Sequence, residues 1–537
     1  MTDVDPISRD VFQHEVVGIA EEMSMALRRA AFSSIIWDMY DYACGLFTPD
    51  GEMLAQAQTI PAQLGIMSTA IHHMFEVIPR DDWHSGDVIV CNDPYRGCTH
   101  TPDIVLFSPV FHDDELIAIA STIAHHIDIG GRVPGTEDST ATEVFGEGLI
   151  LPPLKLVESG KPNKTIFDII AANVRDPHGS HGDLRAQIAG CRTGERRLCE
   201  LASRYGNRRF AEFAKACLDY AEIYIRRSLA AIGSGHSEAE ILIEDDAGTD
   251  EPILLKAAVA VDGENLTVDF TGSSAQRVNG LNCPISSTVS MAHYAVKAIL
   301  TPDLLQNEGC NRPLKIIAPK GSILNPVRPA AVSVRHLTEQ AVADVVLRAL
   351  APLSPSTAAA GCQISFPTFC GGGLDDRPER SDEEGGAPYY VISDILGGGM
   401  GAFAKGDGMS AIDTHGGNCA ILSAEIMETM SPFRIRKTEL VSDSGGVGEH
   451  SGGLGVLRDY ELLGESSIVS GYLQQTKEET APWGFAGGGS GGKAAFILNP
   501  NSNREEVFST KLVAFKMKKG DVLRMVSSGG GGWGEPK

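Results

Sequence analysis

The N-terminal segment carries apolar residues at helical spacing. They recur every three or four positions from Val11 to Ala30, and Asp5-Pro6 provides a helix start signal. This pattern predicts a long amphipathic helix that ends near Ser33-Ser34.

Helix and strand patterns alternate in the segments that follow. Residues 40–47 predict a strand that leads into the turn Thr48-Pro49-Asp50-Gly51, and β-branched runs predict further strands. The other predicted elements are a helix over 65–78, strands over 88–91, 104–110 and 116–124, two helices within 182–231, strands within 240–271, and helices near 286–300 and 336–351.

The pattern changes from Pro355 onward, where short apolar strands lie between glycine runs. These runs fall at 371–373, 397–399, 445–446, 452–453, 487–489 and 529–532. The whole pattern predicts a multidomain α+β protein. Its expected domains are an N-terminal α+β domain (1–235), a central α/β domain (236–354) and a Gly-rich, β-dominated C-terminal domain (355–537).

Composition narrows the class of protein. Hydrophobic residues make up 42% and charged residues 21% of the 537 positions, which excludes wholesale disorder. The net charge of −25 argues against binding to nucleic acid or to a membrane surface. No run of 18 apolar residues and no signal-peptide pattern occurs.

The cysteines indicate a reducing compartment. Eleven cysteines without a CxxC pair, in a chain without a recognisable leader, predict free thiols and a cytoplasmic location. Cys91 and Cys98 flank the most polar segment, and we expect them to be small buried hydrophobes.

The densest set of candidate ligands lies between residues 92 and 128. His100 and Asp103 are separated by Thr-Pro, and His125 ends the apolar strand 116–124. Imidazole and carboxylate together suit zinc, manganese or iron. The alternative is a buried set of hydrogen-bonded polar residues without a metal.

A further carboxylate could come from the segment after the first helix. Asp38 and Asp41 are three positions apart there, and either could be a ligand. A buried acid is costly unless it is paired or bound to a cation. The alternative for each is a capping or surface role.

Other motifs give weaker signals. Residues 487–494 match the start of a phosphate-binding loop but have Ala494 where Ser or Thr is required, and a strand follows, so we expect a hairpin. Asp183 is predicted to cap a helix, with His178 and His181 in the loop before it. Two glycine-containing segments could shape a pocket or be ordinary turns. They are Asp394 with residues 397–399, and residues 414–418.

The chain resembles the hydantoinase B/oxoprolinase family. The resemblance rests on segments along its whole length, among them YDYACGLFTPDG, VIVCNDPYRGCTHTPDIVLFSPVF, IAHHIDIGG, GDLRAQIAGCRTGERRLCEL, NEGCNRPLKIIAPKGSILNP and SSGGGGWGEP. It implies a subunit that completes a reaction at one buried divalent metal, with zinc favoured. It also implies a hydantoinase A-type partner that uses ATP and Mg²⁺ to phosphorylate the substrate.

The resemblance carries roles to particular residues. It implies that His100, Asp103 and His125 are metal ligands, with Asp41 as the carboxylate from the earlier segment and Asp38 as the alternative. His126 or Asp128 would serve as general base or as an orienting group.

The implied reaction is ring opening of a cyclic amide such as hydantoin, N-methylhydantoin, 5-oxoproline or a lactam, within a hetero-oligomer. Two alternatives stay open at this point. One is a subunit of an ATP-dependent ketone carboxylase, and the other is a non-catalytic scaffold for the ATPase subunit.

Overall fold

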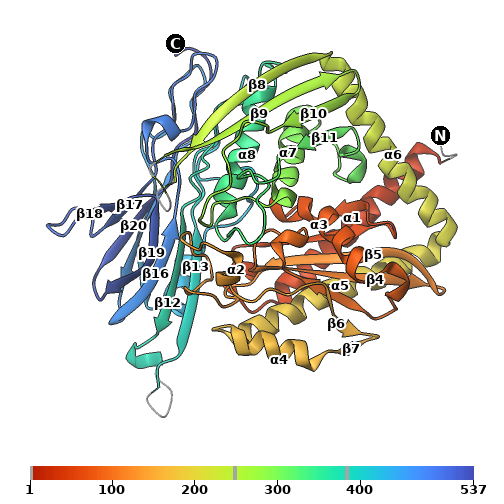
Figure 1. Ribbon diagram of the computed structural model, residues 1–537, viewed down its shortest axis with the longest axis horizontal. Helices are drawn as coiled ribbons and strands as arrows, with labels where there is room; N and C mark the ends of the chain where they lie inside the picture. The colour runs from red at the N-terminus through yellow and green to blue at the C-terminus, as the bar shows by residue number, and fades with distance from the viewer. Residues whose placement is uncertain (1–3, 246–248, 250, 381–385, 537) are drawn as a thin grey trace.

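Three parts of the molecule lie side by side. The computed structural model describes residues 4–245, 249, 251–380 and 386–536. Figure 1 shows a mixed N-terminal part in red to yellow, a central part in green and a β-rich C-terminal part in blue. The predicted multidomain α+β class is confirmed, whereas the exact domain boundaries stay a prediction.

The helices lie mainly in the first two parts. They are α1 (Pro6–Ala30), α2 (Ser34–Trp37), α3 (Pro61–Val77), α4 (Lys164–Asn173), α5 (Pro177–Tyr205), α6 (Asn207–Ile232), α7 (Ile285–Leu300), α8 (Arg335–Leu350) and α9 (Ala424–Met430).

An antiparallel sheet of seven strands organises the N-terminal part. The strand order is β2-β1-β5-β4-β3-β6-β7. The strands are β1 (Tyr42–Phe47), β2 (Met53–Gln56), β3 (Val88–Cys91), β4 (Asp103–His112), β5 (Glu115–His125), β6 (Leu154–Glu158) and β7 (Lys161–Pro162). Because successive side chains alternate between faces, one face packs on α3 and the other on α4 and α5.

Local signals account for where the first helices begin and end. Asp5 caps α1 by accepting hydrogen bonds from the amides of Ile7 and Ser8. The helix ends at Ala30, before the predicted end at Ser33-Ser34, and the short helix α2 follows it. Strand β1 begins at Tyr42 rather than at residue 40, because Tyr40 has a left-handed backbone with φ of 66°.

The start of α5 differs from the sequence-based expectation. The cap is Asp176, whose carboxylate accepts a hydrogen bond from the Gly179 amide (2.9 Å), and Pro177 is the first helical residue. The prediction that Asp183 caps this helix is wrong. Asp183 lies inside α5, and its carboxylate accepts hydrogen bonds from the amides of Phe32 (2.7 Å) and Ser33 (3.1 Å).

The central part packs a small sheet against two helices. Its strands are β8 (Gly235–Ile243), β9 (Ile253–Asp262), β10 (Asn265–Asp269) and β11 (Leu314–Ile317), in the order β11-β10-β9-β8. One face of β8 and β9 is buried and packs on α8, as the arcs above α8 in Figure 1 show. This packing places the N-terminal end of α8 beside the N-terminal part.

Two antiparallel sheets form the C-terminal part. The first contains β12 (Thr368–Leu374), β13 (Tyr389–Ile395), β16 (Ser466–Tyr472) and β19 (Lys511–Lys518). The second contains β14 (Phe433–Leu440), β15 (Val456–Leu462), β17 (Ala495–Leu498), β18 (Glu506–Phe508) and β20 (Val522–Val526). Phe369 of the first sheet stacks on Tyr460 of the second, with ring centroids 4.6 Å apart.

Glycine-rich segments pack backbone against backbone beside these sheets. The Gly530 amide donates to the Gly453 carbonyl (2.9 Å), and the Gly453 amide donates to the Met400 carbonyl (2.9 Å). A Cβ atom on Gly530 would lie 2.0 Å from the Met400 carbonyl oxygen. Glycine is therefore required here for close approach, which explains the glycine runs in the sequence.

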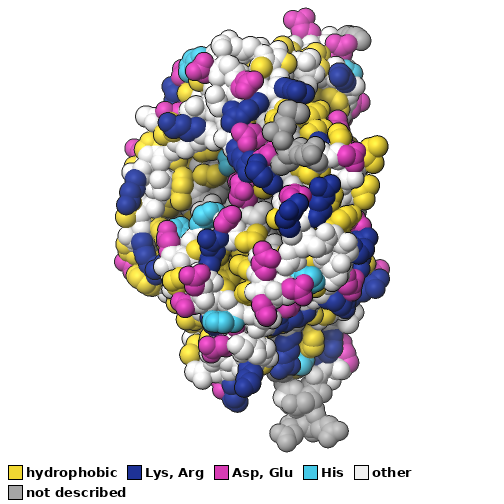
Figure 2. Space-filling view, turned by 90° about the vertical axis from the view of Figure 1, so that its right-hand side faces the viewer, with side chains coloured by type: hydrophobic (Ala, Val, Ile, Leu, Met, Phe, Trp, Pro, Cys, Tyr) yellow, Lys and Arg dark blue, Asp and Glu magenta, His cyan; other side chains and the backbone are white. Residues whose placement is uncertain are grey.

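The surface carries mixed charge, and the cysteines are unpaired. On the face shown in Figure 2, the described acidic and basic side chains are interspersed, with no broad basic area. Within the described residues, no helix is both long and apolar enough to cross a membrane. All eleven cysteines are free, and Cys91 and Cys98 are fully buried.

Gly530→Ala should lower the thermal unfolding midpoint by several degrees, because its Cβ atom would force two backbones apart at a cost of about 1–3 kcal/mol. Gly18→Ala is the matched control. Gly18 lies in α1 with nothing within 4 Å of an added Cβ atom, so this substitution should raise or preserve the midpoint. Equal midpoints for the two variants, measured by calorimetry, would contradict this account of the glycine packing.

Candidate metal centre

A buried cavity lies where the N-terminal sheet, α3, α8 and the C-terminal part meet. Its volume is about 50 Å³, several times the ~10–15 Å³ that one water molecule needs. The polar side chains that line it are Asp41, Gln63, His100, Asp103, His125, Glu137, Arg335, His336, Glu339, Gln340, Thr368, Ser393 and Tyr472.

Strand pairing brings three of the predicted ligands together. Asp103, the first residue of β4, is directly opposite His125, the last residue of β5. Asp41 immediately precedes β1, and its carbonyl accepts a hydrogen bond from the His125 amide (3.1 Å). These three odd-numbered positions face α3, because alternation along the paired strands puts them on one side of the sheet.

His100 completes the group from the turn before β4. Its Nε2 atom is 3.2 Å from His125 Nδ1 and 3.4 Å from Asp103 Oδ1, and His125 Nδ1 is 3.1 Å from Asp103 Oδ1. Ligand atoms around a tetrahedral zinc ion lie about 3.3–3.6 Å from one another. The three side chains therefore fit a divalent ion, and Asp41 Oδ2, 4.0 Å from His125 Nδ1, lies within reach as a fourth ligand.

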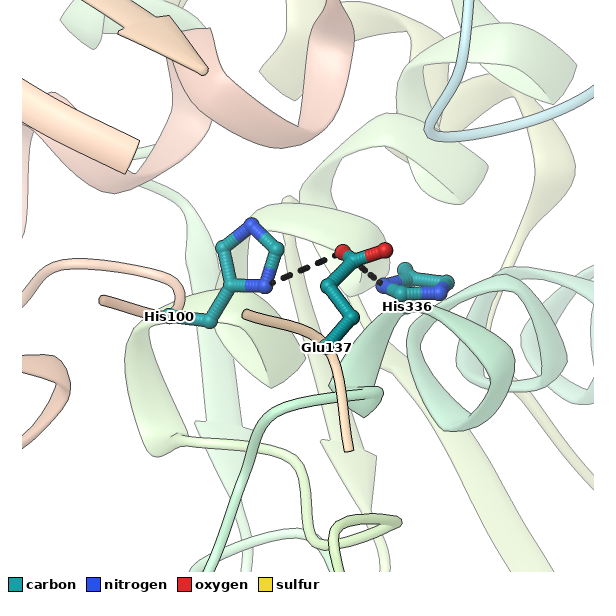
Figure 3. Close-up of side chains that lie close together, drawn as sticks. All are labelled: His100, Glu137 and His336. Carbon is teal, nitrogen blue, oxygen red and sulfur yellow. Dashed lines mark ion pairs between the residues drawn. The ribbon is translucent and has the colours of Figure 1, made fainter. Parts of the chain in front are cut away.

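A second possible ligand group shares His100. Figure 3 shows the Glu137 carboxylate between the imidazoles of His100 and His336. Glu137 Oε1 is 3.5 Å from His100 Nδ1 and 3.9 Å from His336 Nδ1. However, His100 Nδ1 is also 3.0 Å from the Ser333 carbonyl oxygen, which can only accept a hydrogen bond. That contact assigns the proton to Nδ1 and leaves Nε2 free, which favours the site with Asp103 and His125.

Neighbouring side chains hold the two carboxylates in place. Gln63 of α3 donates from Nε2 to Asp41 Oδ1 (2.8 Å). Arg335, at the start of α8, donates from Nη2 to Asp103 Oδ2 (3.0 Å), and the Thr99 hydroxyl donates to the same oxygen. These contacts leave Asp103 Oδ1 directed towards the two histidines, as a metal-binding carboxylate requires.

Burial and charge shift the pKa values of this group. Burial raises the pKa of Asp41 to about 7. Burial by itself lowers the pKa of His125, but the hydrogen bond to Asp103 and the charge of Asp41 outweigh it and raise that pKa to about 9. A cation that binds here must displace the proton from His125, so its affinity should increase with pH.

The structure places Asp38 and His126 outside the cavity. The Asp38 carboxylate accepts a hydrogen bond from the Ser423 amide (2.9 Å). His126 follows His125 and therefore faces the opposite side of the sheet, where its Nε2 atom is 3.0 Å from Gln187 Oε1 on α5. This position does not suit the predicted role of general base.

Asp128 also lies outside the cavity lining. Its carboxylate accepts hydrogen bonds from the amides of Gly130 (2.9 Å) and Arg175 (2.9 Å), and it forms an ion pair with the Arg175 guanidinium (2.8 Å). These contacts hold the loop after β5 against the segment before α5, so Asp128 contributes to loop structure.

Sequence reasoning missed the half of the cavity that comes from distant segments. Arg335, His336 and Glu339 project from the first turns of α8, and Glu137 comes from the loop after β5. The sequence did offer one signal for these cavity residues: three charged or titratable residues stand at the start of a predicted helix that is otherwise apolar. Nothing in the sequence pairs that helix with Glu137.

The weaker motifs have structural explanations. His178 and His181 lie within α5, not in the predicted loop. Residues 487–492 precede β17, a strand, which agrees with the predicted hairpin rather than a phosphate-binding loop. Asp394 is buried in contact with Arg458 (2.6 Å), whereas Gly416 and Gly417 form part of the cavity wall.

Comparison with known proteins identifies relatives along the whole chain. The sequence is 34% identical to an uncharacterized protein of Methanocaldococcus jannaschii over 99% of this chain and 91% of the relative. It is 32% identical to a protein of Pseudomonas sp. strain NS671 that is named as the B-type subunit of a D-/L-hydantoinase. This match covers 99% of this chain and 90% of that protein. It is also 29% identical to the 5-oxoprolinase of Dictyostelium discoideum, over 99% of this chain but 41% of that protein.

Two solved structures have the same fold. The ATP-dependent caprolactamase of Pseudomonas jessenii matches with a TM-score of 0.90 and 26% identity, over 99% of this chain and 92% of that chain. A nucleotide-free acetone carboxylase matches with a TM-score of 0.90 and 19% identity, over 99% of this chain and 76% of that chain. The family model described as hydantoinase B/oxoprolinase matches residues 5–536. The chain therefore belongs to the hydantoinase B/oxoprolinase family.

Proposed function

We propose that this chain is the hydrolytic subunit of an ATP-dependent cyclic-amide hydrolase. In this proposal it completes ring opening of a substrate that a partner ATPase has phosphorylated. The observation that carries the proposal is the convergence of His100, Asp103 and His125, with Asp41 beside them, in one buried cavity. The names of the relatives, which include a hydantoinase component, 5-oxoprolinases and a caprolactamase, support the reaction class.

The four ligand residues would hold one divalent ion, with zinc favoured and manganese or iron compatible with the same donors. When bound, such an ion supplies a water molecule of lowered pKa and an electrophilic centre. The contribution of the protein is to hold the metal-binding side chains in fixed positions. Ser333 orients His100, Gln63 holds Asp41, and Arg335 with Thr99 holds Asp103.

His336 is the proposed general base in place of His126. Its Nε2 atom is buried without a hydrogen-bond partner in the cavity lining, and its Nδ1 atom faces Glu137. Burial and the Arg335 charge hold the pKa of His336 well below its usual range, so the imidazole is neutral, and its Nε2 atom has a free lone pair directed into the cavity lining. Tyr472 donates a hydrogen bond to Glu137, which keeps the carboxylate next to Nδ1.

The proposal includes a hydantoinase A-type partner that binds ATP and Mg²⁺ and forms a hetero-oligomer with this chain in the cytoplasm. Its support is the absence of a recognisable phosphate-binding loop in the sequence, together with the printed description of the caprolactamase as ATP-dependent. Phosphorylation by the partner would make the ring carbonyl a better electrophile before it reaches the cavity. Ketone carboxylation is not favoured, because the acetone carboxylase match at 19% identity shows the fold alone.

Replacing His100 or His125 with Ala should remove the bound metal from this cavity and abolish ring opening, while the partner still hydrolyses ATP. Metal analysis of the purified variants and an ATPase assay of the complex provide the measurements. Asp41→Asn should weaken metal binding. Asp38→Asn is the matched control and should retain both metal and turnover. Ring opening that survives in the His100→Ala/His125→Ala variant would support the scaffold alternative.

His336→Gln should keep the metal but lower the rate of ring opening by about 100-fold or more, which is the usual contribution of a general base. His126→Gln, on the opposite face of the sheet, should change the rate by less than about tenfold. A larger loss in His126→Gln than in His336→Gln would reverse the assignment of the base.

The purified chain alone should hydrolyse neither ATP nor hydantoin, 5-oxoproline or caprolactam. Addition of the ATPase-type subunit from the same organism should produce ring opening that depends on ATP and is independent of bicarbonate. Steady ATP hydrolysis by the single chain, or turnover of acetone that requires bicarbonate, would refute the proposed division of labour.

A further inference from the structure

A second cluster of ligand-type side chains lies behind the cavity wall. Asp344 projects from α8, Cys362 from the extended segment before β12, and His415 from the loop before α9. Their ligand atoms all lie within 4.8 Å of one another, with Asp344 Oδ1 3.3 Å from His415 Nε2. All three side chains are buried, although they come from distant parts of the sequence.

Hydrogen-bond donors are directed at the sulfur and the carboxylate of this cluster. The Gly401 amide donates to Cys362 Sγ (3.3 Å), and the Trp483 indole donates to Asp344 Oδ2 (2.6 Å). The Cys362 amide also donates to Asp344 Oδ1 (3.1 Å). Such contacts hold the sulfur and the carboxylate in fixed positions, as the outer contacts of metal-binding side chains do.

The three side chains form a compact group in the protein interior. The backbone of His415 has a left-handed φ of 54°, which is unusual for a residue with a side chain. A carboxylate buried beside a sulfur and an imidazole is costly unless it is paired or bound to a cation.

We propose that Asp344, Cys362 and His415 form a second metal site, separate from the cavity and specific for a divalent ion that accepts a thiolate ligand. This set of sulfur, nitrogen and oxygen donors suits zinc and does not suit magnesium or calcium. Three protein ligands leave a fourth position for water.

An ion bound there would stiffen one wall of the cavity. His415 is followed by Gly416 and Gly417, which line the cavity. Gln340 lies about one turn before Asp344 on α8, also lines the cavity, and accepts a hydrogen bond from the Gly416 amide (3.1 Å). A metal ion that joins α8 to His415 would therefore fix this wall relative to His336.

Cobalt substitution tests the proposal, because a cobalt–thiolate bond gives near-ultraviolet charge-transfer absorption that nitrogen and oxygen ligands do not. Metal-free wild-type chain loaded with Co²⁺ should show this absorption and bind about two ions per chain. The His100→Ala/His125→Ala variant should keep the absorption and lose one ion. Cys362→Ser should lose both the absorption and one ion.

Cys310→Ser is the matched control, because Cys310 is buried outside this cluster and should leave the spectrum unchanged. Absence of the thiolate absorption in the wild-type chain would overturn the proposal without reference to any variant, so poor folding of Cys362→Ser cannot hide the result. Absorption that persists in folded Cys362→Ser would overturn it as well. In either case the three groups form a hydrogen-bonded thiol–imidazole–carboxylate chain without a metal.

Discussion

The antiparallel pairing of β1, β5 and β4 is the constraint on which the cavity depends. It places Asp41, His125 and Asp103 next to one another at the ends of three neighbouring strands, on the face that α3 covers. A shift of one residue in the β4–β5 register would turn His125 to the opposite face and put His126 in its place. Both faces of β4 and β5 are buried, so such a shift would exchange the side chains packed on α3 with those packed on the opposite face and would disrupt the close packing on both sides.

Burying two carboxylates beside two imidazoles requires compensation, and the rest of the molecule supplies it. Arg335 at the start of α8 neutralises Asp103, and Gln63 satisfies one oxygen of Asp41. The central part must therefore pack against the N-terminal sheet for the site to exist. A continuous set of buried apolar residues runs through all three parts and maintains this packing. The candidate metal site is consequently a property of the whole chain, although most of its proposed ligands come from a short segment.

Sequence patterns predicted the local features and missed the long-range ones. The strands that carry Asp103 and His125 were predicted from their β-branched runs, and the candidate ligands were proposed from residue types and family resemblance. The choice of His126 as base ignored the alternation that separates it from His125. Glu137 and His336 could not be paired from the sequence, because nearly 200 residues separate them and they meet through the packing of α8. The same holds for Asp344, Cys362 and His415, which no spacing motif connects.

The central claim is that His100, Asp103, His125 and Asp41 hold a divalent ion in the cavity between the three parts. X-ray anomalous scattering from crystals of the purified chain, recorded on both sides of the zinc absorption edge, tests this most directly. The account predicts an anomalous peak enclosed by these four side chains. Well-ordered density for all four residues without an anomalous peak among them, at the zinc, manganese or iron edge, would contradict it.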